Sequence, residues 1–182
     1  MKKYTVLLLA IVALFLTSCN GEPTLQKYFV EKSEAKDFMA VDIAPSIINT
    51  SKLTLSADEK TALASLHNIN VLAYKLNGKN NAEYEKEKIN VKTLLKTDHY
   101  DELIKFNNGS MGASVNTKGE GQHIEEFVIF VNEADNGFGV VRVVGKDMTP
   151  TNVMTIVSLL QKSDLHIEQL KPLQQMMMKN RT

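Results

Sequence analysis

One cysteine and the residues before it have the clearest chemical potential in this sequence. Cys19 is the only cysteine among 182 residues, and Leu16, Thr17 and Ser18 precede it. A leucine three residues before a cysteine, with small residues between them, forms a lipobox, the processing site of bacterial lipoproteins. The expected chemistry is transfer of a diacylglycerol group to the thiol as a thioether, cleavage before Cys19, and acylation of the new amine.

The residues before the lipobox have the layout of a secretory signal. Met1-Lys2-Lys3 forms a cationic leader, and the thirteen residues from Tyr4 to Leu16 are almost entirely apolar. A run of this length is too short to cross a bilayer, which needs about 20 residues. A plain signal peptide, an uncleaved anchor or a core helix would also be apolar, but a plain signal does not require cysteine. We therefore predict that residues 1–18 are removed as a lipoprotein signal peptide.

Lipidation of Cys19 also predicts a location. Two or three acyl chains anchor a protein stably, because each buried methylene contributes about 0.8 kcal/mol. Asn20 occupies the position where aspartate is the usual inner-membrane retention signal in enterobacteria, which favours the outer membrane. No acidic cluster directly follows Cys19, which favours a domain facing the periplasm. The predicted partners are the membrane, through the lipid on Cys19, and another envelope protein.

The histidines offer little for a metal site. They lie far apart, and none belongs to a His-x-His or His-Glu-x-x-His motif. The densest polar cluster is Asp98, His99 and Asp101, which are candidates for ligand or partner contact. Catalytic zinc needs about three ligands, but this cluster lies at an expected helix-to-strand turn, where Asp and His are common for capping and solvation. We predict no metal and no cofactor.

No arrangement typical of covalent catalysis was found either. The segment from Asn108 to Gly112 superficially resembles the Gly-x-Ser-x-Gly nucleophile motif, but asparagine occupies the first glycine position. Gly137-Phe138-Gly139 opens an expected strand rather than a helix, so it is not a dinucleotide fingerprint. We predict no catalytic residue and a protein that is not an enzyme.

Arg142 is the one charge within an otherwise apolar expected strand, and it is the remaining candidate for ligand or partner contact. Charges inside sheets are usually paired or placed at an edge. A buried pair with Glu126 or another carboxylate is therefore the favoured interpretation, and a ligand clamp is the alternative.

Composition disfavours one class of function. Without residues 1–18 the chain has 164 residues, enough for one domain with its own core. Without Lys2 and Lys3, 19 basic residues remain against 21 acidic ones, a formal charge of −2, and they form no clustered basic face. Nucleic-acid binding is disfavoured, because it needs positive charge to neutralise phosphates. With Cys19 lipidated, stability has to come from packing rather than from a disulfide.

Hydrophobic periodicity and turn residues predict alternating elements, followed by a run of strands. Helices are expected over 24–34, 56–66 and 82–96, with a last helix capped by Thr149. Strands are expected over 37–43, 69–76, 100–106, 111–116, 124–131 and 138–144. The last four strands follow one another through short turns and form an antiparallel meander, whereas helical crossovers join the first two strands to the sheet.

The predicted fold class is α+β, a single two-layer domain. Its sheet is expected to be mixed but mostly antiparallel, with about six strands and with helices packed on one face. Residues 19–23 form the lipidated cysteine and a tether, and residues 24–164 form the domain. Residues 165–182 form a C-terminal tail that is partly helical or disordered.

Several segments give the chain a family resemblance over residues 36–162. They are the lipobox, Ile69-Asn70-Val71-Leu72, Tyr100-Asp101-Glu102-Leu103, the strand from Ile124 to Ile129, and Val143-Val144-Gly145-Lys146-Asp147-Met148. With them the chain resembles a lipoprotein family of Bacteroidota-type bacteria, the domain of unknown function numbered forty-two fifty-two. The resemblance implies an exported lipoprotein and carries no activity to transfer.

These features predict an exported, lipid-anchored envelope protein with a non-enzymatic interaction or binding role. One alternative is a small-ligand-binding domain with a pocket between sheet and helices, which an open cleft next to Arg142 would favour. The other is a metal-dependent, hydrolase-like enzyme that uses Asp98, His99 and Asp101.

Overall fold

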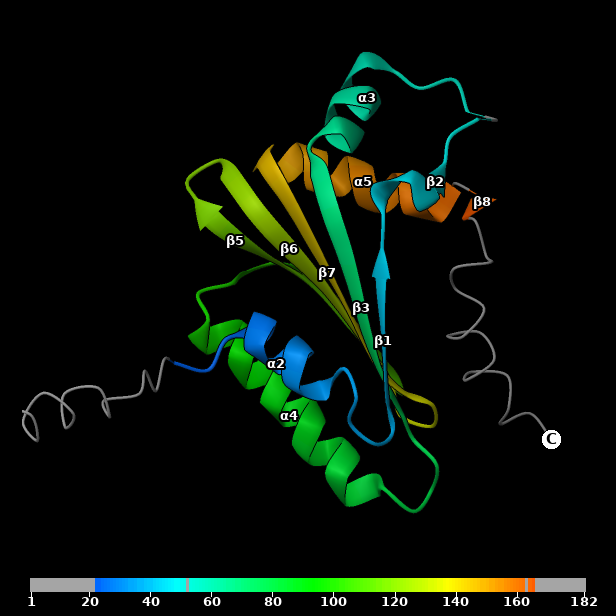
Figure 1. The fold of residues 1–182 in the computed structure, drawn as a ribbon, viewed down its shortest axis with the longest axis vertical. Coiled ribbons are helices and arrows are strands. Elements are labelled where there is room, and N and C mark those ends of the chain that lie inside the picture. The colour runs from blue at the N-terminus through cyan, green and yellow to red at the C-terminus, as the bar shows by residue number, and fades with distance from the viewer. Residues whose placement is uncertain (1–21, 52, 163, 166–182) are drawn as a thin grey trace, which may run out of the picture.

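The computed structural model describes residues 22–51, 53–162 and 164–165 (Figure 1). The predicted signal peptide, Cys19 and the tail beyond residue 165 lie outside the described residues. Within the described part of the chain, no helix combines the length and the apolar composition needed to cross a membrane.

The described chain alternates helices and strands and then runs through four consecutive strands. The elements, in order, are α2 Leu25–Lys32, β1 Phe38–Ile43, the 3-10 helix η1 Pro45–Ile47, β2 Ile48–Asn49, α3 Ala57–Ala64, β3 Leu66–Lys75, α4 Asn81–Thr97, β4 Asp101–Asn108, β5 Met111–Glu120, β6 His123–Glu133, β7 Gly137–Met148, α5 Pro150–Lys162 and β8 Asp164–Leu165.

Local sequence signals explain where α3 begins and ends. The Ser56 hydroxyl accepts a hydrogen bond from the Glu59 N–H at 3.1 Å, and the Glu59 carboxylate accepts one from the Ser56 N–H at 2.8 Å, which is the predicted capping box. The helix ends at Ala64 instead of the predicted Leu66. Leu66 is buried and already paired with Gly145 of β7, so its apolar side chain belongs to a strand.

Six strands form one open sheet in the order β1-β3-β7-β6-β5-β4. The α+β class and the C-terminal meander are thus confirmed. Every pair of neighbouring strands in this sheet is antiparallel, so the mixed sheet that we expected contains no parallel pair. The reason lies in α3, which sits beyond the end of the strands in Figure 1 and lets β3 return directly beside β1.

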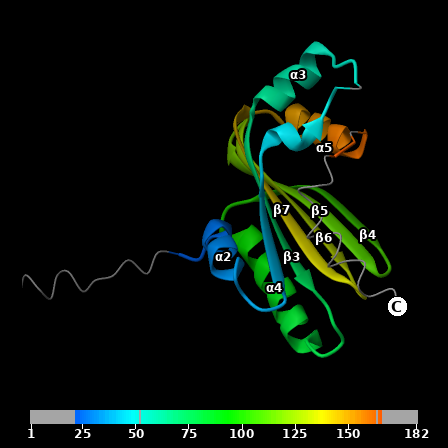
Figure 2. The ribbon, with the colours of Figure 1, turned by 45° about the vertical axis from the view of Figure 1, so that its right-hand side comes forward.

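The helices lie on both faces of the sheet, which corrects the prediction of one covered face. We call the face under α2 and α4 the first face; Leu72, Phe130 and Val140 point to it. On the second face, α5 covers Phe127 and Val143 near one end of the strands. Figures 1 and 2 show α2 and α4 at one end of the sheet and α3 and α5 at the other. Successive residues of a strand point to opposite faces, and the central strands are apolar at both sets of positions, so both faces need cover.

A buried carboxylate links the two helices of the first face. Glu87 of α4 is 1% exposed. It accepts a hydrogen bond from the Tyr28 hydroxyl at 2.8 Å and pairs with the Lys32 ammonium at 2.5 Å. Burial acts to raise the pKa of Glu87, but the hydrogen bonds from Lys32, Tyr28 and Asn90 outweigh it and leave the pKa lowered. The ionised form of Glu87 therefore stabilises the contact between α2 and α4.

This arrangement predicts a pH dependence of stability. A folded-state pKa below the usual value near 4.5 means that the stabilisation is present above that pH and is lost as the pH falls through the folded-state pKa. Glu87→Gln should lower the free energy of unfolding at pH 7 by about 1–2 kcal/mol and flatten its pH dependence below pH 4.5. Chemical denaturation across this range measures both effects. Glu83→Gln, an exposed change on the same helix, is the control, and an equal effect of the two substitutions would contradict the assignment.

Candidate anion-binding pocket

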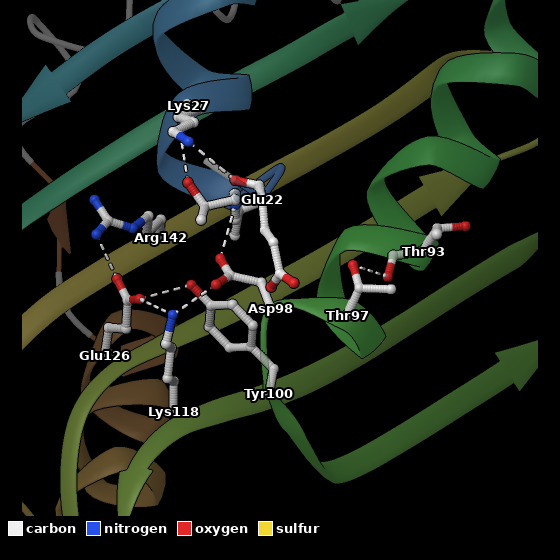
Figure 3. Close-up of polar contacts among 11 residues, drawn as sticks. Glu22, Lys27, Thr93, Thr97, Asp98, Tyr100, Lys118, Glu126 and Arg142 are labelled. Carbon is white, nitrogen blue, oxygen red and sulfur yellow. Dashed lines mark hydrogen bonds and ion pairs between the residues drawn. The ribbon is translucent and has the colours of Figure 1, made fainter. Parts of the chain in front are cut away.

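A chain of polar side chains crosses the first face beside the start of α2 (Figure 3). It runs from Asp98 at the end of α4 through Lys118 of β5 and Glu126 of β6 to Arg142 of β7. The Lys118 ammonium lies 2.7 Å from Asp98 Oδ1 and 4.0 Å from Glu126 Oε1, and Arg142 Nη2 lies 2.5 Å from Glu126 Oε2. Opposite charges therefore alternate along the chain, which compensates for their burial.

Asp98 anchors the first end of this chain. Its Oδ2 accepts a hydrogen bond from the Leu25 N–H at 2.8 Å. Leu25 is the first residue of α2, where a backbone donor has no partner within the helix. The Asp98 carboxylate is 7% exposed, so it caps α2 from inside the molecule and is not presented to a ligand.

Glu126 occupies the middle of the chain. The Tyr100 hydroxyl donates to Glu126 Oε1 at 2.7 Å, and desolvation together with the negative charge of Glu126 raises the pKa of Tyr100. Arg142 also donates to Asn70 Oδ1 at 3.3 Å, and the Asn70 amide donates to Asp42. The predicted pairing of Arg142 with Glu126 is thus confirmed.

The structure separates the candidate residues near the end of α4. His99 has a φ of 58°, the left-handed conformation that follows many helices, and the Tyr100 N–H closes the turn by bonding to the Leu95 carbonyl at 3.2 Å. His99 and Asp101 are exposed, whereas Asp98 turns inward. Among the described residues, no group of three or more His, Cys, Asp or Glu side chains is placed to hold a metal ion.

A pocket of about 380 Å³ opens next to these polar side chains, between the second half of α4 and strands β4, β5 and β6. This volume falls within the range of about 300–1,000 Å³ typical of small-ligand sites. Apolar side chains contributed by different elements form part of its lining: Leu95, Tyr100 and Phe130. Polar donors surround them: Lys92, Lys96, Lys105, Asn107, Asn116 and Asn132.

Sheet register brings the polar residues together. Lys105 of β4 lies opposite Ser114 of β5, and Asn107 lies opposite Gly112, which in turn lies opposite Asn132 of β6. A Cβ atom on Gly112 would lie 2.8 Å from Asn132 Oδ1 and 3.1 Å from Asn107 Oδ1. The absence of a side chain at Gly112 therefore leaves room for the two amides to approach each other.

The lysines give the pocket a positive potential. Lys105 pairs with Glu102 at 3.2 Å, but neither Lys92 nor Lys96 pairs with any carboxylate that the structure describes. Lys92 Nζ lies 5.7 Å from the centre of the Phe130 ring. Desolvation, followed by the positive charges of Lys88, Lys105 and Lys96, lowers the pKa of Lys92. An anion in the pocket would relieve this repulsion.

Chemically, this arrangement is suited to binding. The lining contains one carboxylate, Glu102, which pairs with Lys105, and no histidine, cysteine or aspartate; Ser114 accepts a hydrogen bond from the Asn116 amide at 2.8 Å. Ammonium and amide donors above an apolar floor fit a small molecule with a carboxylate or phosphate group. Arg142 is not part of the lining; Glu126 and Tyr100 connect it to the pocket.

Sequence reasoning missed the pocket lysines. Lys92 and Lys96 fall within the helix predicted over 82–96, where no motif distinguishes them, and Lys105 lies on a different element. The one available signal was local: asparagine, glycine and serine recur from Asn107 to Ser114 in a strand pair that could have been more apolar.

The comparisons with known proteins identify a family and no function. A family model described as "Domain of unknown function (DUF4252)" matches residues 28–156, a span that includes the polar chain and the pocket. Neither a curated protein nor a solved structure matched the chain.

The polar chain predicts a large effect of removing its first carboxylate. Asp98→Ala would leave Lys118 and the Leu25 N–H without their buried partner, so we expect the free energy of unfolding to fall by about 2–3 kcal/mol. Asp101→Ala, three residues away and exposed, is the matched control and should change it by less than about 0.5 kcal/mol. Urea denaturation measures both, and equal losses would show that Asp98 carries no special role.

Proposed function

Because the chain belongs to this family of unknown function, we propose a role from its own residues: a non-enzymatic, lipid-anchored binding module of the cell envelope. In this proposal the pocket under α4 binds a small organic anion. The observation that carries it is the convergence of Lys92 and Lys96 on an apolar floor, where neither forms an ion pair with a described carboxylate; Glu102, the one carboxylate of the lining, pairs with Lys105.

Three features of the pocket support an anionic ligand over a neutral one. Positive charge converges from α4 and β4, and the amides of Asn107, Asn116 and Asn132 can donate further hydrogen bonds. Desolvation, and then repulsion by neighbouring lysines, lowers the pKa of Lys92, and an anion would favour its charged form. Carboxylates and phosphates share the ability to accept several such bonds. We therefore name the ligand class by this shared chemistry.

The lipobox supports the envelope location. In the proposal, Cys19 carries the lipid, residues 1–18 are removed, and the domain faces the periplasm from the outer membrane. Leu25 is the sixth residue after Cys19, and a segment of that length spans at most about 20 Å. Since the Leu25 N–H bonds to Asp98, the bilayer surface would lie close to the end of α4 that lines the pocket.

Calorimetric titration with inorganic phosphate, glycerol phosphate and citrate tests the ligand class, with neutral glycerol as the comparison. Lys92→Met and Lys96→Met should each weaken anion binding about tenfold, the effect of one lost charge-assisted hydrogen bond of about 1.5 kcal/mol. Lys92→Met should also raise the Tm without anion, because it removes one of the repelling charges. A lysine needed only for packing would instead lower it.

Lys86→Met provides the control for this experiment, because Lys86 lies on the same helix, is 72% exposed and is absent from the pocket lining. It should bind anions like the native protein. Vesicles of phosphatidylglycerol, compared with phosphatidylcholine vesicles, distinguish a lipid headgroup from a soluble anion as the ligand. Equal binding of glycerol and anions, or equal losses in Lys86→Met and Lys92→Met, would contradict the proposal.

Lipidation has a separate test in the native cells. The full chain should incorporate labelled palmitate and fractionate with membranes, and Cys19→Ser should abolish both, because the thioether needs the thiol. Ser18→Ala keeps a small residue in the lipobox and should remain labelled. A native chain without label would contradict the anchor while leaving the pocket proposal intact.

A further inference from the structure

The second face of the sheet contains an apolar area that continues beyond the core cluster formed with Val153 and Ile156 of α5. Sheet register aligns two rows across all six strands. The first row is Val41, Val71, Val141, Ile129, Val115 and Ile104. The second row is Met39, Ala73, Gly139, Val131, Ala113 and Phe106. We call these twelve residues the open face.

Every position of the open face is apolar, although several of its side chains are in contact with water. Phe106 is 48% exposed, Ile104 41% and Val131 37%. The residues next to them in sequence, such as Lys105 and Asn132, point to the first face and line the pocket. An antiparallel sheet with one solvated face normally carries polar residues on that face. This pattern therefore indicates a face that another segment covers.

We propose that residues 166–182 of the same chain lie across the open face and complete the hydrophobic core of the second face. The path of the described chain supports this occupant. Helix α5 packs on the second face through Val153 and Ile156, and β8, which follows it, pairs with β2, whose Ile48 belongs to the same core. The chain therefore leaves Leu165 on the side of the sheet that needs cover.

The length of the C-terminal segment fits the distance to be crossed. Six strands about 4.8 Å apart span about 24 Å. The 17 residues from His166 to Thr182 would extend about 25 Å as a helix and about 56 Å as a strand. In either conformation the segment can reach from the end of α5 to the edge strand β4.

The composition of the segment also fits an apolar surface. Ile167, Leu170, Leu173 and Met176 recur at every third residue, and Met177 and Met178 follow. Methionine side chains are flexible and adapt to an irregular surface. Valine and isoleucine form the first row, so we expect a contact between aliphatic side chains that involves no ion pair.

Thiol accessibility tests the proposal in the chain from residue 19 onward, with Cys19→Ser as background so that one thiol can be introduced at a time. Ala113 and Ser114 are successive half-buried residues of β5 that point to opposite faces, which makes Ala113→Cys and Ser114→Cys a matched pair. In the full chain, Cys at position 113 should react with a maleimide about tenfold more slowly than Cys at position 114, because local opening of the covering segment limits access.

Truncation after Leu165 should remove this difference. Because a truncated chain can fail to fold, the same measurement is made in the full chain with Leu170→Asp and Leu173→Asp, which weaken apolar contact without shortening the segment. Equal rates for the two positions in the native full chain would overturn the proposal. Protection that disappears on dilution would also overturn it, because it would assign a second copy of the protein to the open face.

Discussion

The buried carboxylate of Asp98 is the contact on which the arrangement of the first face depends. One carboxylate oxygen caps the first turn of α2, and the other pairs with Lys118 of β5. The backbone N–H of Asp98 donates to the Leu94 carbonyl in the last turn of α4. A negative charge at the start of α2 also interacts favourably with the helix dipole. Since α4 contributes Leu95 and Lys96 to the pocket, the same carboxylate positions the pocket wall and the point where the N-terminal tether joins the domain.

The pleat of the sheet separates two different surfaces within the same strands. Lys105 and Asn132 point to the pocket, whereas their neighbours Phe106 and Val131 point to the open face. A register shift of one residue in β4 would exchange these sets, so pairing errors at this edge are costly on both faces. The pairing of β4, β5 and β6 also favours glycine at position 112, because a Cβ atom there would crowd the side chains of Asn107 and Asn132.

Local signals in the sequence predicted the elements better than their assembly. The capping box at Ser56, the C-terminal meander and the pairing of Arg142 with Glu126 follow from spacing and from the cost of a lone charge among valines. The division of helices between two faces was missed, because periodicity shows that a strand is apolar on both sides but not which helix covers each. A pocket between sheet and helices was an alternative expectation beside Arg142, but its lysines were missed because Lys92 and Lys105 lie on separate elements that only the tertiary structure brings together.

The pairing of charges separates the carboxylates that stabilise the fold from the lysines of the proposed anion pocket. Asp98, Glu126 and Glu87 are buried, and each has at least one cation and one neutral donor as partners. Ionised groups that serve only the fold have to be compensated in this way, because desolvation without a partner costs several kcal/mol. Lys92 and Lys96 form no such ion pair within the described structure, and around Lys92 the positive charges of Lys88, Lys105 and Lys96 outnumber the negative charge of Glu85. The proposed anion site would carry this cost in its empty state.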